Sequence, residues 1–350
     1  MFFIRALGVL MLFSMAAAQS ASRVQVRLVA DEPEAVLAIL AKKQAGSAIT
    51  DADWKALFDT EGYQRLKKRE LSMKRPFEDA EFKEFVLSQD LLSRATALKQ
   101  TLEKWKRADL SRSAALALAY LPENATIRAT IYPSIKPRDN SFVFEVQSNP
   151  AIFLYIDPQV TQAEFENTLA HELHHIGYGT ACPVSASKQW SAQQPAAIQQ
   201  FNEWVGAFGE GYAMLAAAGG PDIHPRATTT AEKRQRWDSD MANFDKNQQE
   251  LNKYFQDILS GRLTGDKVAE QGFTYFGYQG PWYTVGWKMA VTIEKAFGRE
   301  KLIQAECDGS ALAVYNTAAE AINKSGKQSL PLWSPDVINA LPSQQKQDHR

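Results

Sequence analysis

The sequence predicts an α+β protein that is mostly helical and has one small mixed β-sheet. Three observations predict this class: helical periodicity up to about residue 121, short strand-like runs after residue 122, and helical patterns again from residue 161. Separate blocks of helices and strands are typical of α+β folds. The chain has 350 residues, 45% of them hydrophobic, which suffices for one large core or two smaller ones.

The N-terminal segment, residues 1–18, has the pattern of a secretory signal peptide. Arg5 supplies a positive charge, an apolar run follows over 6–15, and small residues occupy 16–18. We expect cleavage after Ala18 and a periplasmic or secreted mature protein; the alternative is a buried N-terminal helix. The apolar run is too short for a permanent membrane span, so we expect no such span in the mature form.

Three regions follow the signal peptide. Residues 19–121 are predicted to be helical, because residues recur at spacings of three and four along one face: Phe82, Phe85, Val86, Leu92 and Thr96. Residues 122–340 contain the predicted sheet and the later helices. Residues 341–350 are predicted to be a polar tail.

The strands come first in the second region. Three short runs rich in Ile, Val, Phe and Thr are bounded by turn residues and are predicted strands: 125–132, 141–146 and 151–156. The next helix should cover 161–176, since Thr161 and Glu164 form a capping-box pattern and Gly177 follows. Further helices are expected over 195–218 and from residue 231 on.

Charge and cysteine content limit the possible partners. There are 39 Lys and Arg residues and 40 Asp and Glu residues, so the chain has no excess of basic residues for a nucleic-acid partner. There are only two cysteines, Cys182 and Cys307. Export would permit a disulfide between them. Two separate buried thiols are an equally good interpretation at this point.

One cluster of histidines has the spacing of a metal site. His171 and His175 are four residues apart, which places them on one face of a helix where both can bind one zinc ion. Glu172 lies beside them and could act on a water molecule at the metal. The apolar residues of this helix fall on another face: Phe165, Leu169, Leu173 and Ile176. His174 points away from the pair and should lie behind the ligands or at the surface. The alternative is a helix with coincidental histidines.

A catalytic zinc ion needs a third protein ligand. Glu210 is the favoured candidate, because small residues surround it and would let two helices approach closely: Gly206, Gly209, Gly211 and Ala213. Glu203, one heptad earlier, and His224 remain open as alternatives.

Two further motifs extend this pattern. Glu210-Gly211-Tyr212-Ala213 and, later, Tyr283-Thr-Val-Gly286 follow the His-Glu-x-x-His sequence. Together they resemble the gluzincin-type zinc peptidases of bacteria that carry only domain-of-unknown-function labels, over about residues 151–316. The resemblance implies a zincin-like fold in which strand 151–156 is the substrate-side edge of the sheet. It also gives Tyr283 a role as hydrogen-bond donor to the oxyanion, although packing among neighbouring aromatic residues explains Tyr283 equally well.

The leading hypothesis is an exported zinc metallopeptidase that acts on a peptide or protein substrate. His171, His175 and Glu210 would hold Zn²⁺, and Glu172 would be the general base. One alternative is an exported helical binding or scaffold protein with a zinc-capable but non-catalytic site. Another alternative is a zinc enzyme that hydrolyses a non-peptide amide.

Overall fold

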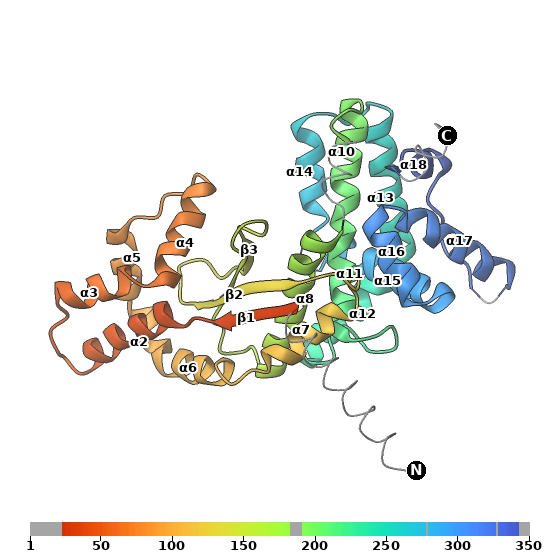
Figure 1. Ribbon diagram of the computed structural model, residues 1–350. Helices are drawn as coiled ribbons and strands as arrows, with labels where there is room; N and C mark the ends of the chain where they lie inside the picture. The colour runs from red at the N-terminus through yellow and green to blue at the C-terminus, as the bar shows by residue number, and fades with distance from the viewer. Residues whose placement is uncertain (1–22, 183–190, 278, 327, 343–350) are drawn as a thin grey trace, which may run out of the picture. The chain divides into compact units, whose positions relative to one another are not determined.

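The computed structural model describes residues 23–182, 191–277, 279–326 and 328–342 (Figure 1). They form two compact units. The first comprises residues up to Ala114 together with Thr126–Ile176, and the second comprises Ala115–Ala125 together with the residues from Gly177 on. The predicted signal peptide lies outside the described residues.

The N-terminal region is helical from Asp31 on, as the periodicity predicts. Its helices are α2 (Asp31–Gln44), α3 (Asp51–Phe58), α4 (Glu61–Ser72), α5 (Asp79–Val86), α6 (Gln89–Trp105) and α7 (Leu110–Leu118). Capping residues start several of them. Ser88 accepts a hydrogen bond from Leu91 N at 3.2 Å at the start of α6. The Asp31 carboxylate accepts from Glu61 N at 2.7 Å, so it caps α4 from the start of α2.

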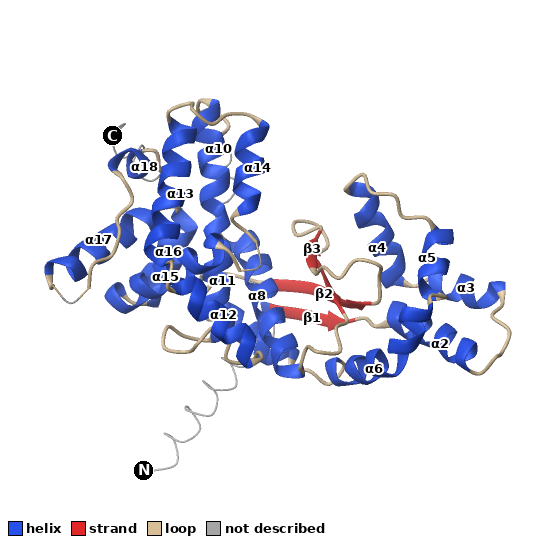
Figure 2. Cartoon of the chain, turned by 180° about the vertical axis from the view of Figure 1, so that it is seen from behind, coloured by secondary structure: helices blue, strands red, loops and turns tan. Residues whose placement is uncertain are grey.

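The four strands found in the described residues belong to the first unit (Figure 2). They are β1 (Val24–Leu28), β2 (Ile127–Ser134), β3 (Phe142–Phe144) and β4 (Ala151–Tyr155). The order is β1-β2-β4-β3, with β1 and β4 parallel to β2 and β3 antiparallel to β4. The sheet is therefore mixed, as predicted. Strand β1 was not predicted, although Val24, Val26 and Leu28 alternate with polar residues in the strand pattern.

The position of β4 corrects one expectation. β4 pairs on one side with β2, where Ile152 lies in register with Ile131, and on the other side with β3, where it faces Val143. It is thus an inner strand and cannot accept an extended peptide. The edges of the sheet are β1 and β3.

Helix α8 (Gln162–Ala181) follows β4 and contains the three clustered histidines. Its start agrees with the prediction, since Thr161 Oγ1 accepts a hydrogen bond from Glu164 N at 3.1 Å. Its predicted end at Ile176 is wrong. The helix continues through Gly177, whose cost within a helix is about 1 kcal/mol and is readily offset by packing.

The second unit is helical. Its elements are α10 (Ala196–Val205), η1 (Gly206–Phe208), α11 (Gly209–Ala218), α12 (Ala231–Met241), α13 (Phe244–Leu259), α14 (Asp266–Thr274), α15 (Pro281–Phe297), α16 (Arg299–Asp308), α17 (Ala311–Lys324) and α18 (Pro335–Asn339). Helices α10, α13 and α14 run side by side (Figures 1 and 2). The helix predicted over 195–218 is divided, because the 3₁₀ turn η1 interrupts it.

Aromatic side chains fill the core of this unit. The ring of Trp282 lies 5.1 Å from Phe208 and 6.0 Å from Phe255, and its Nε1 donates to Gly272 O at 2.9 Å. Leu341 is fully buried, whereas most of the predicted polar tail, 343–350, lies outside the described residues. Within the described part of the chain, we find no helix that is both long and apolar enough to cross a membrane.

Candidate metal centre

Helix α8 brings the predicted histidine pair together. The Nε2 atoms of His171 and His175 are 3.1 Å apart, and the two rings are nearly perpendicular, at 82°. His171 is 9% exposed and His175 is half-buried. The predicted apolar stripe on this helix is buried: Phe165, Leu169, Leu173 and Ile176. Burial of this stripe fixes the rotation of α8 and therefore the direction of both imidazoles.

The distance between the two nitrogens fits a shared metal ion. A tetrahedral zinc ion with Zn–N bonds of about 2.0–2.1 Å separates two nitrogen ligands by about 3.3–3.4 Å. The observed 3.1 Å is close to that separation. The same distance also suits a hydrogen bond in which one Nε2–H donates to the other Nε2. The pair is thus preorganised for an ion that replaces this proton.

Among the described residues, one group of three side chains has the donor set and spacing to hold a metal ion: His171, His175 and Glu210. One ligand atom from each lies within 4.8 Å of the other two. Two imidazoles and one carboxylate are a known ligand set for catalytic zinc, which leaves a fourth position open. The residues present therefore fit zinc.

Glu210 is positioned by a close crossing of two helices in the second unit. It lies in the first turn of α11, next to Gly211, and α11 packs against α15. A Cβ atom added to Gly211 would lie 2.1 Å from Trp287 N and 2.3 Å from the carbonyl carbon of Gly286. The backbones of α11 and α15 therefore touch, which confirms that small residues allow a close approach here. Gly206 and Gly209 do not contribute, since a Cβ atom on either would meet nothing within 4 Å.

The remaining candidates for a third ligand are not in this group. Glu203 is exposed on α10. His224 uses both ring nitrogens: Nδ1 accepts from Arg226 N at 2.9 Å, and Nε2 lies 3.2 Å from Asp238 Oδ1. His174 is 1% exposed, so it is buried and not at the surface.

The two predicted catalytic side chains are both half-buried. Glu172 follows His171 on α8, about 100° further round the helix. Tyr283 lies in the first turn of α15, one turn before Gly286, and its ring is 6.4 Å from that of Phe276. Their roles in catalysis stay predictions.

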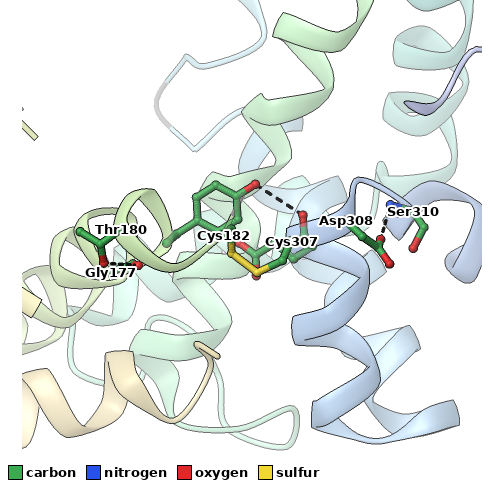
Figure 3. Close-up of a disulfide and its surroundings, with 8 residues drawn as sticks. Gly177, Thr180, Cys182, Cys307, Asp308 and Ser310 are labelled. Carbon is green, nitrogen blue, oxygen red and sulfur yellow. Dashed lines mark hydrogen bonds between the residues drawn. A yellow bond between two sulfur atoms is a disulfide. The ribbon is translucent and has the colours of Figure 1, made fainter. Parts of the chain in front are cut away.

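A disulfide fixes the end of the histidine helix. Cys182 directly follows α8 and is bonded to Cys307 of α16, with the two Cα atoms 4.8 Å apart (Figure 3). Nearby, the Tyr178 hydroxyl donates to Glu306 O at 3.4 Å. The interpretation as a disulfide, which the sequence left open, is therefore the correct one.

One feature of the site was undervalued in the sequence. The Tyr-x-x-Gly stretch is a weak motif by itself, but its glycine, Gly286, is the partner of Gly211 at the helix crossing. The contact explains why the Glu-Gly-x-Ala and Tyr-x-x-Gly motifs occur together in one sequence, since each motif supplies one of the two glycines. The sequence signal for this contact was Gly286 itself, a glycine in a helix whose other residues are mostly bulky.

Comparison with known proteins identifies the family of the chain. Neither the curated proteins nor the solved structures gave a match. A family model matches residues 54–324 and thus also covers N-terminal helices that the motif resemblance, which begins at residue 151, does not reach. Because this match covers most of the chain, the protein belongs to the family described as "Putative zinc dependent peptidase (DUF5700)".

Proposed function

We propose that the protein is an exported zinc-dependent metallopeptidase. The observation that carries the proposal is the arrangement of His171 and His175 one turn apart with facing Nε2 atoms, together with Glu210 in the same ligand group. The family description supports a zinc-dependent peptidase. The peptide specificity and the catalytic roles below are part of the proposal.

In this proposal, His171, His175 and Glu210 hold the zinc ion. When bound, zinc supplies Lewis acidity, which polarises a carbonyl group and makes water more acidic. The Glu172 carboxylate takes a proton from the water that attacks the scissile carbonyl carbon. Glu172 then gives this proton to the amine nitrogen as the C–N bond breaks, so that the carboxylate is regenerated.

Tyr283 has a supporting role. Its hydroxyl group would donate a hydrogen bond to the oxyanion that develops on the carbonyl oxygen. Its backbone is well held, because Pro281 starts α15 and Tyr283 N donates to Gly280 O at 3.0 Å. Glycine at 280 is required there, since a Cβ atom would lie 2.4 Å from Tyr275 O.

The substrate would pair with β3 instead of β4. Strand β3 is the antiparallel edge of the sheet in the unit that contains His171 and His175. An extended peptide can add to such an edge through main-chain hydrogen bonds. This assignment transfers the predicted substrate-binding role from residues 151–156 to Phe142–Phe144.

The replacement Glu172→Gln tests the proposal. The variant should keep one zinc ion per chain, measured by elemental analysis, but lose cleavage of a peptide library. Glu203→Gln, in an exposed position on α10, is the matched control and should cleave like the wild type. Undiminished cleavage by the Glu172 variant would show that the base is another residue. A wild type that binds zinc but cleaves no peptide would favour the binding or scaffold protein.

Export needs a separate test. Expression with the complete N-terminus in a Gram-negative host should yield a periplasmic protein whose first residue, by mass spectrometry, is Gln19. An unprocessed cytoplasmic product would contradict the signal peptide. The disulfide supports export, because such bonds persist mainly in oxidising compartments.

A further inference from the structure

A cavity in the first unit lies apart from the candidate metal centre. Its volume is about 200 Å³, and it lies between the connection from α4 to α5 and the segment that follows β2. Leu66, Phe77 and Phe82 form its apolar wall. None of the three candidate zinc ligands lines it. The volume suits one amino-acid residue and is smaller than typical sites for drug-sized ligands, about 300–1,000 Å³.

A buried lysine lines the same cavity. Lys136 is 3% exposed, and its ammonium donates to Arg138 O and, at 2.8 Å, to Asn140 Oδ1. An ammonium group has three donors, so two are used. The ammonium also lies 5.5 Å from the ring centroid of Phe142 and 5.7 Å from that of Tyr155. Among the described residues, no oxygen or nitrogen acceptor for the third donor is found. A buried charge with an unused donor is costly unless a further group binds it.

The buried carboxylate in the cavity wall is bound by other side chains. Glu70 is a buried carboxylate of the cavity wall, but its oxygens are bound by two guanidinium groups: Arg69 at 2.6 Å and Arg75 at 3.6 Å. The Glu70 carboxylate is therefore already paired, and the buried Glu32 and the exposed Asp139 also face the Lys136 ammonium. Lys136 and Arg138 are the two cations of the cavity lining, and both are available to an anion.

The lining of the cavity also contains acidic residues. Glu78 and Glu81 line the cavity and are both exposed. They are able to accept hydrogen bonds from an ammonium group, and since water screens them, they oppose an anion near Lys136 only weakly. The cavity thus offers cations, an apolar wall and carboxylates, in one small volume.

We propose that this cavity binds an apolar amino acid through its α-carboxylate. The carboxylate is held by Lys136 and Arg138, and the apolar side chain packs against Leu66, Phe77 and Phe82. The same chemistry is present in a free amino acid and in the C-terminal residue of a peptide. A free amino acid would also place its ammonium group near Glu78 and Glu81.

Titration calorimetry with the full-length protein tests this site. The protein is first freed of metal with a chelator, so that neither hydrolysis nor carboxylate binding to zinc contributes. L-Phenylalanine is expected to bind with a Kd of about 1 mM or tighter, and L-phenylalaninamide, which lacks the carboxylate, at least about tenfold more weakly. Equal binding of the two compounds, or no binding of phenylalanine, would overturn the proposal.

Two more ligands distinguish a site for a free amino acid from a site for the C-terminus of a peptide. If the site is built for a free amino acid, N-acetyl-L-phenylalanine should bind more weakly than phenylalanine, because it lacks the ammonium group. If it is built for a peptide C-terminus, Gly-Gly-Phe should bind as well as phenylalanine or better. Either result supports the carboxylate site.

Variants then locate the binding. Arg138→Gln changes an exposed rim residue and should not affect folding, and Lys136→Met removes the buried charge. Both should weaken phenylalanine binding by about tenfold or more, as expected for loss of a charged hydrogen bond. Arg112→Gln, also exposed but outside the cavity, is the matched control and should bind normally. Unchanged affinity in both test variants would place the ligand elsewhere. Because the protein is free of metal, the outcome does not depend on the peptidase proposal.

Discussion

Gly211 and Gly286 lie in direct backbone contact where α11 crosses α15. A Cβ atom on Gly286 would lie 2.7 Å from Phe208 O and 3.1 Å from the Cα atom of Gly211. No side chain longer than hydrogen fits between the two helices at this point. The contact therefore fixes the first turn of α11, which carries Glu210, against α15.

We predict that Gly286→Ala separates the two helices. The free energy of unfolding should fall by about 2 kcal/mol, as is typical when a packed site receives an extra methyl group. Zinc affinity should fall by about 10–100-fold, the usual effect of disturbing a residue that supports a ligand. Urea unfolding and competition with a zinc chelator measure the two effects.

The control for this variant is Gly209→Ala. A Cβ atom at Gly209 meets nothing within 4 Å. Alanine should therefore leave zinc affinity unchanged and stabilise the helix by about 0.5–1 kcal/mol. If both variants behave alike, the close contact between α11 and α15 does not govern the ligand.

Glu210→Gln should weaken zinc binding strongly, because a neutral amide replaces the only carboxylate in the group of three ligands. We expect a loss of at least about 100-fold in zinc affinity, equal to about 3 kcal/mol. Glu203→Gln should have no effect. The reverse result would make Glu203 the ligand and would contradict the spacing of the described side chains.

Removal of the disulfide should destabilise the protein considerably. The bond joins residues separated by 125 positions, and closing a loop of that length restricts the unfolded chain by about 5 kcal/mol in the entropic model. The double variant Cys182→Ala/Cys307→Ala should lose about 2–5 kcal/mol in urea unfolding. A reducing agent should lower the stability of the wild type to that of the variant and leave the variant unchanged.

Lys136 should make stability depend on alkaline pH. Burial lowers the pKa of Lys136 to about 8, although the nearby Glu70 carboxylate opposes this shift; Arg69, Asp139 and Glu32 also face the ammonium. Between this value and the ordinary lysine pKa of about 10.4, the unfolded chain binds more protons than the folded one, so stability rises with pH. The wild type should gain about 1–3 kcal/mol from pH 7.5 to pH 10 relative to Lys136→Met.

The matched variant for this comparison is Lys301→Met. Lys301 is only partly buried on α16, and its ammonium lies 3.2 Å from Gln304 Oε1. This variant should keep the full pH dependence of the wild type. A wild type and a Lys136 variant with parallel pH profiles would show that Lys136 titrates normally.

Local patterns were sufficient to predict much of the site. The four-residue spacing of His171 and His175 and the apolar stripe of their helix depend only on helix geometry, and both are present in the structure. The three strands were predicted from composition. The order of the strands in the sheet was not predicted. β3 and β4 form an antiparallel pair, and only tertiary pairing decides that β4 and not β3 lies beside β2. For that reason the edge strand was assigned incorrectly.

Other features depend on tertiary contacts that no local pattern contains. Helix α8 passes through Gly177 because its last turn is held by Cys182 and Tyr178. Strand β1 is only five residues long and finds its partner about 100 positions later. The cavity around Lys136 combines residues from α4, α5 and the segment after β2, so nothing in any one of these segments predicts it.

The pairing of β1 with β2 has a consequence for how the polypeptide reaches its native state. Val24 meets Ile127, and Leu28 meets Ile131. A chain emerging from a ribosome or a translocon must therefore expose its first strand without a partner until more than a hundred further residues have followed. Such distant pairing slows folding. Under the proposed export, this delay would help the precursor to remain unfolded until it has crossed the membrane.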